Sequence, residues 1–72
     1  MHYRLSFLDK AGNVAREREA DFADDSGAVQ WMRAAGAEQA AQPGWNLVEL
    51  RCQGRFIAGL PAWAAKTSWK SK

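Results

Sequence analysis

The chain has 72 residues, which is room for one domain, and ten Lys and Arg against eight Asp and Glu give a net charge of +2. A single cysteine, Cys52, excludes an internal disulfide, and with one distant histidine, His2, the soft ligands fall short of the roughly four that structural zinc takes. No stretch approaches the ~20 apolar residues of a membrane span, and residues 1–20 lack the apolar run of a secretory signal. We therefore expect a protein of the reducing cytoplasm that holds no metal or cofactor.

A hairpin of two strands is predicted for residues 2–22. Its first half alternates apolar and polar side chains, which is typical of a half-buried strand. A turn at residues 9–13 then leads into the returning strand. Pairing Asp9 with Val14 places two arginines beside the apolar side chains, which suits an edge strand whose long stems cover the margin of the core. The apolar side chains are Tyr3, Leu5 and Phe7, and their neighbours on that face are Val14, Arg16, Arg18, Ala20 and Phe22.

One helix is predicted from Asp24-Asp25-Ser26 to about Ala41, since a carboxylate at that start accepts a first-turn N–H and favours the positive end of the dipole. A stripe of small residues at helical spacing indicates a close approach to the sheet. Gly36 costs ~1 kcal/mol relative to alanine in a helix interior, so we expect it to mark a tight contact. The stripe consists of Ala28, Val29, Met32, Ala35 and Gly36.

A second hairpin is predicted from residues 45–52 and 55–60, joined by the turn Gln53-Gly54. In the register that this turn sets, one face fits under the helix, with Val48, Leu50, Cys52 and Ile57. The opposite face is too apolar for a solvated surface, and it carries Trp45, Leu47, Glu49, Arg51, Phe56, Ala58 and Leu60. The expected fold is α+β, a ββαββ domain at residues 1–60 with an antiparallel four-stranded sheet and one helix packed on one face. A basic, Trp-containing tail follows at 61–72.

A resemblance supports this order of elements. The opening strand resembles that of a group of short, uncharacterised bacterial proteins that begin His-Tyr-Arg-Leu-Tyr-Phe-Leu-Asp. The similarity covers residues 2–60; it implies the ββαββ architecture and no activity, and the tail lies outside it. The chain departs from the pattern at Arg16, Arg18 and Gly27. The matching residues are His2-Tyr3-Arg4-Leu5-Ser6-Phe7-Leu8-Asp9, Gly12, Asp24-Asp25, Ala28-Val29 and Val48-Glu49-Leu50.

Catalytic candidates are few. Cys52 and His2 would have to meet to form a nucleophile and its base, yet Cys52 is in phase with buried neighbours and is expected to behave as a small apolar residue. The carboxylate pairs are interpreted as an exposed strand face and a helix cap rather than an acid–base pair, because a domain of this size has little material for a cleft. We expect no enzyme and no small-molecule substrate. The pairs are Glu17/Glu19 and Asp24/Asp25.

Charge and aromatic residues point to the C-terminal half as the binding surface. Seven of the eight acids precede residue 40, and the segment after Leu50 carries only basic charges. The favoured function is a regulator-type or inhibitor-type protein-interaction module, either homodimeric or bound to another protein. The alternative is a surface for single-stranded nucleic acid, on which aromatics stack bases and cations hold phosphates. A third reading has the tail folding back over the apolar face. The predicted partner-binding residues are Trp45, Leu47, Arg51, Arg55, Phe56, Leu60, Trp63 and Trp69.

Overall fold

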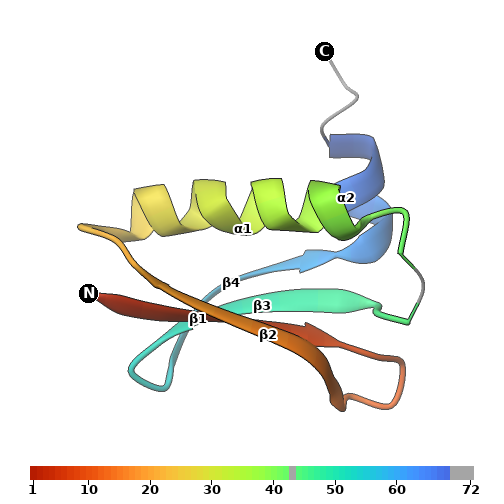
Figure 1. The fold of residues 1–72 in the computed structure, drawn as a ribbon, viewed down its shortest axis with the longest axis horizontal. Helices are drawn as coiled ribbons and strands as arrows, with labels where there is room; N and C mark the ends of the chain where they lie inside the picture. Colours follow the sequence, from red (N-terminus) through yellow and green to blue (C-terminus); the bar gives the residue numbers. More distant parts are fainter. Residues whose placement is uncertain (43, 69–72) are drawn as a thin grey trace.

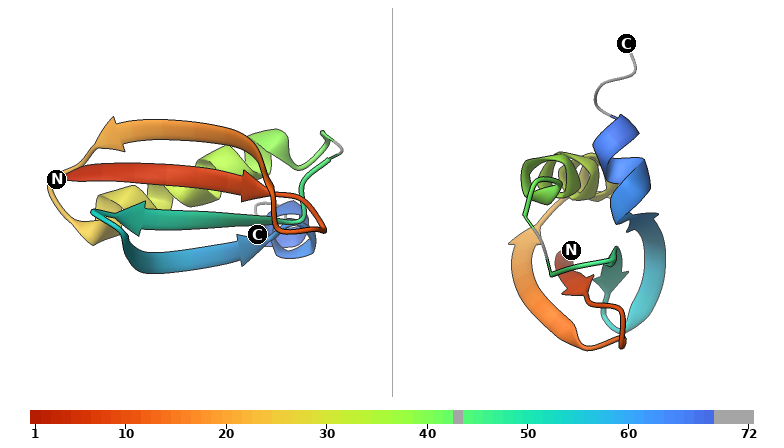
Figure 2. Two further views of the ribbon diagram at one scale, coloured as in Figure 1. Left: turned by 90° about the horizontal axis from the view of Figure 1, so that it is seen from below. Right: turned by 90° about the vertical axis from the view of Figure 1, so that its right-hand side faces the viewer.

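The computed structural model describes residues 1–42 and 44–68 (Figure 1). Its elements are β1 (His2–Leu8), β2 (Val14–Asp21), α1 (Asp25–Gln39), β3 (Leu47–Cys52), β4 (Arg55–Pro61) and α2 (Ala62–Ser68). The strands form one antiparallel sheet in the order β2-β1-β3-β4, which confirms the α+β class and the two hairpins side by side. Both helices lie on the same side of the sheet, and Figure 2 shows β2 and β4 curling toward them. The core therefore fills the concave face, and the convex face, here called the outer face, points away from the helices.

The predicted register of the first hairpin is confirmed over most of its length. Phe7 pairs with Arg16, and Leu5 pairs with Arg18. The guanidinium of Arg18 reaches up to α1, where its Nη1 lies 3.1 Å from the Glu38 carboxylate. A bulge between Phe7 and Leu8 shifts the last pair, so that Leu8 meets Val14. The prediction that Val14 faces the core is therefore wrong: it lies at the outer face.

Helix α1 begins where its capping residue predicts. The Asp24 carboxylate accepts a hydrogen bond from the Gly27 N–H at 3.0 Å, and the helix ends at Gln39, slightly before the predicted Ala41. Gly36 marks the expected tight contact, because a β-carbon there would lie 3.2 Å from Leu60 Cδ2 and 3.4 Å from Ala65 Cβ. The predicted stripe is confirmed, with Val29 half-buried at its margin. Its buried members are Ala28, Met32, Ala35 and Gly36.

The second hairpin contains a bulge that the turn alone did not predict. Gln53 and Gly54 both take positive φ, as a tight two-residue turn requires, and Arg51 pairs with Phe56. The register then shifts, so that Leu50 meets Ala58 and Val48 meets Leu60. An extra residue in one strand turns all later side chains to the other face. Ala58 and Leu60 thus point toward the helices, and their predicted place on the outer face is wrong.

Trp45 is a core residue. Only 8% of its surface is exposed, its ring packs edge-on against Phe7 at a centroid distance of 5.1 Å, and its indole N–H donates to the Gln39 carbonyl at 2.8 Å. It precedes the first residue of β3, Leu47, so strand alternation does not govern its direction. Its predicted position on the outer face is therefore wrong, whereas Cys52 is buried as predicted.

The start of the predicted tail is helical. Helix α2 stands beside the C-terminal end of α1, and Ala65 is buried against Gly36 (Figure 1). Residues 62–65 therefore pack on the helix side of the sheet and leave the outer face uncovered. The predicted site residue Trp69 and the cations Lys70 and Lys72 lie outside the described residues.

Candidate functional site

The outer face has a charged half and an apolar half. Over β1 and β2 the register brings basic and acidic side chains together in cross-strand pairs. Over β3 and β4 the outward side chains are mainly apolar. Because of the bulge, only part of β4 contributes side chains to this face. The charged half consists of His2, Arg4, Glu17, Glu19 and Asp21, with Glu49 and Arg51 at its border, and the apolar half of Leu47, Phe56, Gly59 and Pro61.

Phe56 is the exposed aromatic side chain of this face in the described residues. It is 52% exposed, and its ring lies across Gly59, with Cζ 3.4 Å from the position that a β-carbon there would take. Leu47 Cδ1 borders the same position at 3.7 Å. The Arg51 guanidinium lies 5.6 Å from the ring centroid, within the range of a cation–π contact. The ring thus packs over the backbone of Gly59 beside the Arg51 guanidinium, and about half of the residue's surface remains exposed to solvent.

Arg51 and Arg4 meet at the border between the two halves. They are direct cross-strand partners in the β1–β3 pairing. Arg51 lies 3.4 Å from the Glu49 carboxylate and 3.4 Å from the Gly54 carbonyl, and Arg4 Nε lies 3.4 Å from Glu19. Each contact is longer than the roughly 2.7–2.9 Å of a close charge-assisted hydrogen bond.

The imidazole of His2 bridges two carboxylates of β2. Its Nε2 lies 2.9 Å from Glu19 and its Nδ1 2.9 Å from Asp21. These hydrogen bonds, that to Glu19 first, raise the pKa of His2 above its ordinary value of 6.5. The bond from His2 likewise lowers the pKa of Glu19, with the charge of Arg4 acting in the same direction. The cluster couples the N-terminus of β1 to the edge strand β2.

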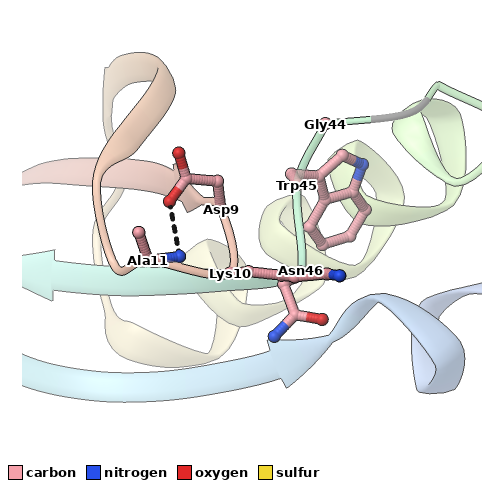
Figure 3. A pocket seen from close by; sticks show the side chains of 6 residues that line it. All are labelled: Asp9, Lys10, Ala11, Gly44, Trp45 and Asn46. Carbon is pink, nitrogen blue, oxygen red and sulfur yellow. Dashed lines mark hydrogen bonds between the residues drawn. The ribbon is translucent and has the colours of Figure 1, made fainter.

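Among the hollows of the described residues, two border the sheet described above. The larger of these two, of about 400 Å³, lies between the β1–β2 turn and the segment before β3, and Figure 3 shows its lining residues. Its polar groups serve the local structure: Asp9 accepts from the Ala11 and Asn13 N–H groups at 2.9 and 3.0 Å, and the Trp45 indole N–H binds the main chain of α1. The smaller, of about 200 Å³, lies on the outer face. Its lining residues are His2, Arg4, Arg51, Gln53 and Gly54.

The structure brings together only some of the predicted partner-binding residues. Leu47, Arg51 and Phe56 share the outer face, whereas Arg55 pairs with Cys52 and extends at the rim of the core side. Trp63, 72% exposed, is carried by α2 on the helix side. Sequence reasoning missed Arg4 and His2, although both alternate out of phase with the buried residues of β1 and so could have been placed on the outer face.

The catalytic candidates are not assembled. Cys52 is buried beside Tyr3, and His2 projects from the opposite face of the sheet. Asp24 caps α1, and Asp25 accepts a hydrogen bond of 2.6 Å from the Tyr3 hydroxyl. Within residues 1–42 and 44–68 there is no group of three or more His, Cys, Asp or Glu side chains suited to a metal ion.

Comparison with protein-family models, with curated proteins and with solved structures finds no match to this chain. In the part of the chain that the structure describes, neither helix has the length and apolar character to cross a membrane. The class of protein is thus defined by its architecture alone, a ββαββ domain with both helices on one face of the sheet.

Proposed function

We propose that this protein is a small, non-enzymatic protein-interaction module of the cytoplasm that binds its partner through the outer face of the sheet. The observation that carries the proposal is Phe56, a half-exposed aromatic ring that packs over Gly59 and contacts Arg51, on a face that the described parts of both helices leave open. Aromatic and arginine side chains at the centre of a patch are the usual anchors of protein interfaces.

The charges of the outer face favour a protein over single-stranded nucleic acid. Arg4 and Arg51 contribute two fixed positive charges there, against four carboxylates. A polyanion laid along the face would be repelled by those acids, whereas a partner with mixed charges meets both signs. Of the basic residues after Leu50, Arg55 also points away from this face, which weakens the nucleic-acid alternative. The four carboxylates are Glu17, Glu19, Asp21 and Glu49.

A foreign partner is favoured over a second copy of the chain. Antiparallel extension of the sheet through β2, centred on Glu17, would set Arg16 opposite Arg18 of the copy on one face and Glu17 opposite its own copy on the other. The β4 edge is interrupted by its bulge.

The test compares two exposed residues of the same face. Phe56 and Val14 are each 52% exposed, but Val14 lies at the far end of β2, opposite Leu8. Proteins from a bacterial lysate are captured on the immobilised full chain and quantified by mass spectrometry. We expect Phe56→Ser to lose partners that Val14→Ser retains. Capture that is unchanged by Phe56→Ser contradicts the proposed face.

Self-association is measured separately by sedimentation velocity over a range of concentrations. We expect a monomer. A dimer that Phe56→Ser dissociates and Val14→Ser does not would identify the partner as a second copy of the chain.

A further inference from the structure

Two arginines face each other directly across β1 and β3, which is an unfavourable arrangement in a sheet. Like charges at directly opposed positions repel, and Arg4 and Arg51 are such a pair on the outer face. Their carboxylate neighbours do not intervene between them, because Glu19 approaches Arg4 from β2 and Glu49 approaches Arg51 from its own strand, each at 3.4 Å. The pair therefore lacks a shared counter-ion in the described structure.

The space beside this pair has the size and chemistry of an oxyanion site. The hollow of about 200 Å³ is closed at one end by the β3–β4 turn, which lies at the same end of the sheet as the N-terminus (Figures 1 and 2). Guanidinium groups offer planar arrays of N–H donors that match the two oxygens of a carboxylate. His2 supplies positive charge when protonated rather than hydrogen bonds, because both of its ring nitrogens are directed at carboxylates of β2.

We infer that Arg4 and Arg51 form a binding site for a carboxylate of the partner protein, with Phe56 receiving the apolar side chain next to it. This inference rests on the proposed function and names the chemistry of the partner: an acidic residue beside an apolar one. A single carboxylate placed between the two guanidinium groups offsets their mutual repulsion. The extended phosphate backbone of a nucleic acid would instead continue onto the acids that contact these arginines, Glu19 and Glu49. The Arg51 guanidinium touches both subsites, since it lines the hollow and lies over Phe56.

The site is tested with free acetate as the probe, on the full chain. The Nε–Hε resonances of the arginines are followed by NMR while acetate replaces chloride at constant ionic strength. We expect saturable shifts at Arg4 and Arg51 and none at Arg33, which is exposed on α1. Arg4→Gln is expected to weaken the response of Arg51 about tenfold, the effect of losing one charge-assisted contact, whereas Arg33→Gln leaves it unchanged. Absence of saturable shifts in the wild-type chain overturns the site.

The partner chemistry is tested with two blocked dipeptides, Asp-Leu and Asn-Leu, and with a short single-stranded oligothymidylate. We expect Asp-Leu to bind more tightly than acetate, to perturb Phe56, and to lose that advantage in Phe56→Ser. Equal binding of Asn-Leu, or tighter binding of the oligonucleotide to the same arginines, overturns the assignment to a carboxylate of a protein. Because acetate needs no partner protein, the two proposals fail separately. If Phe56-dependent capture of partners is observed but acetate causes no saturable shifts, only the carboxylate site is refuted. If acetate causes saturable shifts but capture does not depend on Phe56, the proposed protein partner is refuted.

Discussion

Substitutions of Leu60 and Phe56 test the bulge in β4, because the bulge turns Leu60 toward the helices and leaves Phe56 on the outer face. Leu60 is half-buried against Gly36, and Phe56 is 52% exposed. Truncation of a fully buried leucine costs about 2–5 kcal/mol, and the partial exposure of Leu60 places Leu60→Ala near the lower end, at about 2 kcal/mol. Phe56→Ala removes a ring that is only half covered, so we expect about 1 kcal/mol or less.

These free energies of unfolding translate into well-separated melting temperatures. In a domain of this size 1 kcal/mol corresponds to roughly 4–8 °C, so Leu60→Ala is expected to lower Tm by about 8–16 °C and Phe56→Ala by no more than about 8 °C. A total stability of roughly 3–5 kcal/mol leaves both variants folded. Thermal and urea unfolding, followed by circular dichroism and tryptophan fluorescence, measure the difference. A cost for Leu60→Ala that does not exceed that for Phe56→Ala refutes the bulged register, since without the bulge both side chains would face outward.

Further predictions concern the cap, the histidine and the tyrosine. Asp24→Ala is expected to lower the free energy of unfolding by about 1 kcal/mol and Asp24→Asn to leave it nearly unchanged in urea titrations. NMR titration of His2 should give a pKa above 6.5 that falls in Glu19→Gln. Because the folded state favours protonated His2, the imidazolium stabilises the fold. This stabilisation is fully present below pH 6.5 and is lost as the pH rises through the pKa of His2 in the folded chain. Burial and the hydrogen bond to Asp25 raise the pKa of Tyr3 to about 12, so absorbance at 295 nm should stay flat through pH 10 in the folded chain. The unfolded chain ionises there first, so stability should fall above pH 10, and Tyr3→Phe should abolish that fall.

The order of elements was predictable because it depends on local features. Alternation places Tyr3 and its apolar neighbours in the core, a carboxylate at Asp24 starts the helix, and Gln53-Gly54 supplies the turn. Each of these signals acts within a few residues. They determine which segments are strands, where α1 begins, and which face of β1 is buried, whereas α2 was not predicted.

The composition of the outer face was less predictable because strand bulges are set by packing between distant segments. A two-residue turn fixes the register only beside the turn, and the bulge follows within a few residues. It directs Leu60 to the space that Gly36 leaves on α1, a contact between residues far apart in the sequence. Arg4 was overlooked for a related reason: its importance arises from its pairing with Arg51, which depends on how the two hairpins meet.

The β4 bulge also determines how large the apolar part of the candidate site is. Without it, Leu60 and Ala58 would extend the apolar half along β4 and make a broad, featureless patch. With it, Leu60 packs against α1 and Ala65 of α2, and on the outer face of the described residues the exposed aromatic surface is that of Phe56 beside Arg51. A small aromatic surface next to paired cations selects for an acidic-apolar sequence in the partner more strongly than a broad apolar patch would, because burying an unmatched charge is costly. Leu60 packs against the helices, whereas Phe56 is exposed on the outer face. Substitution of Leu60 is therefore expected to reduce stability, and substitution of Phe56 to reduce binding.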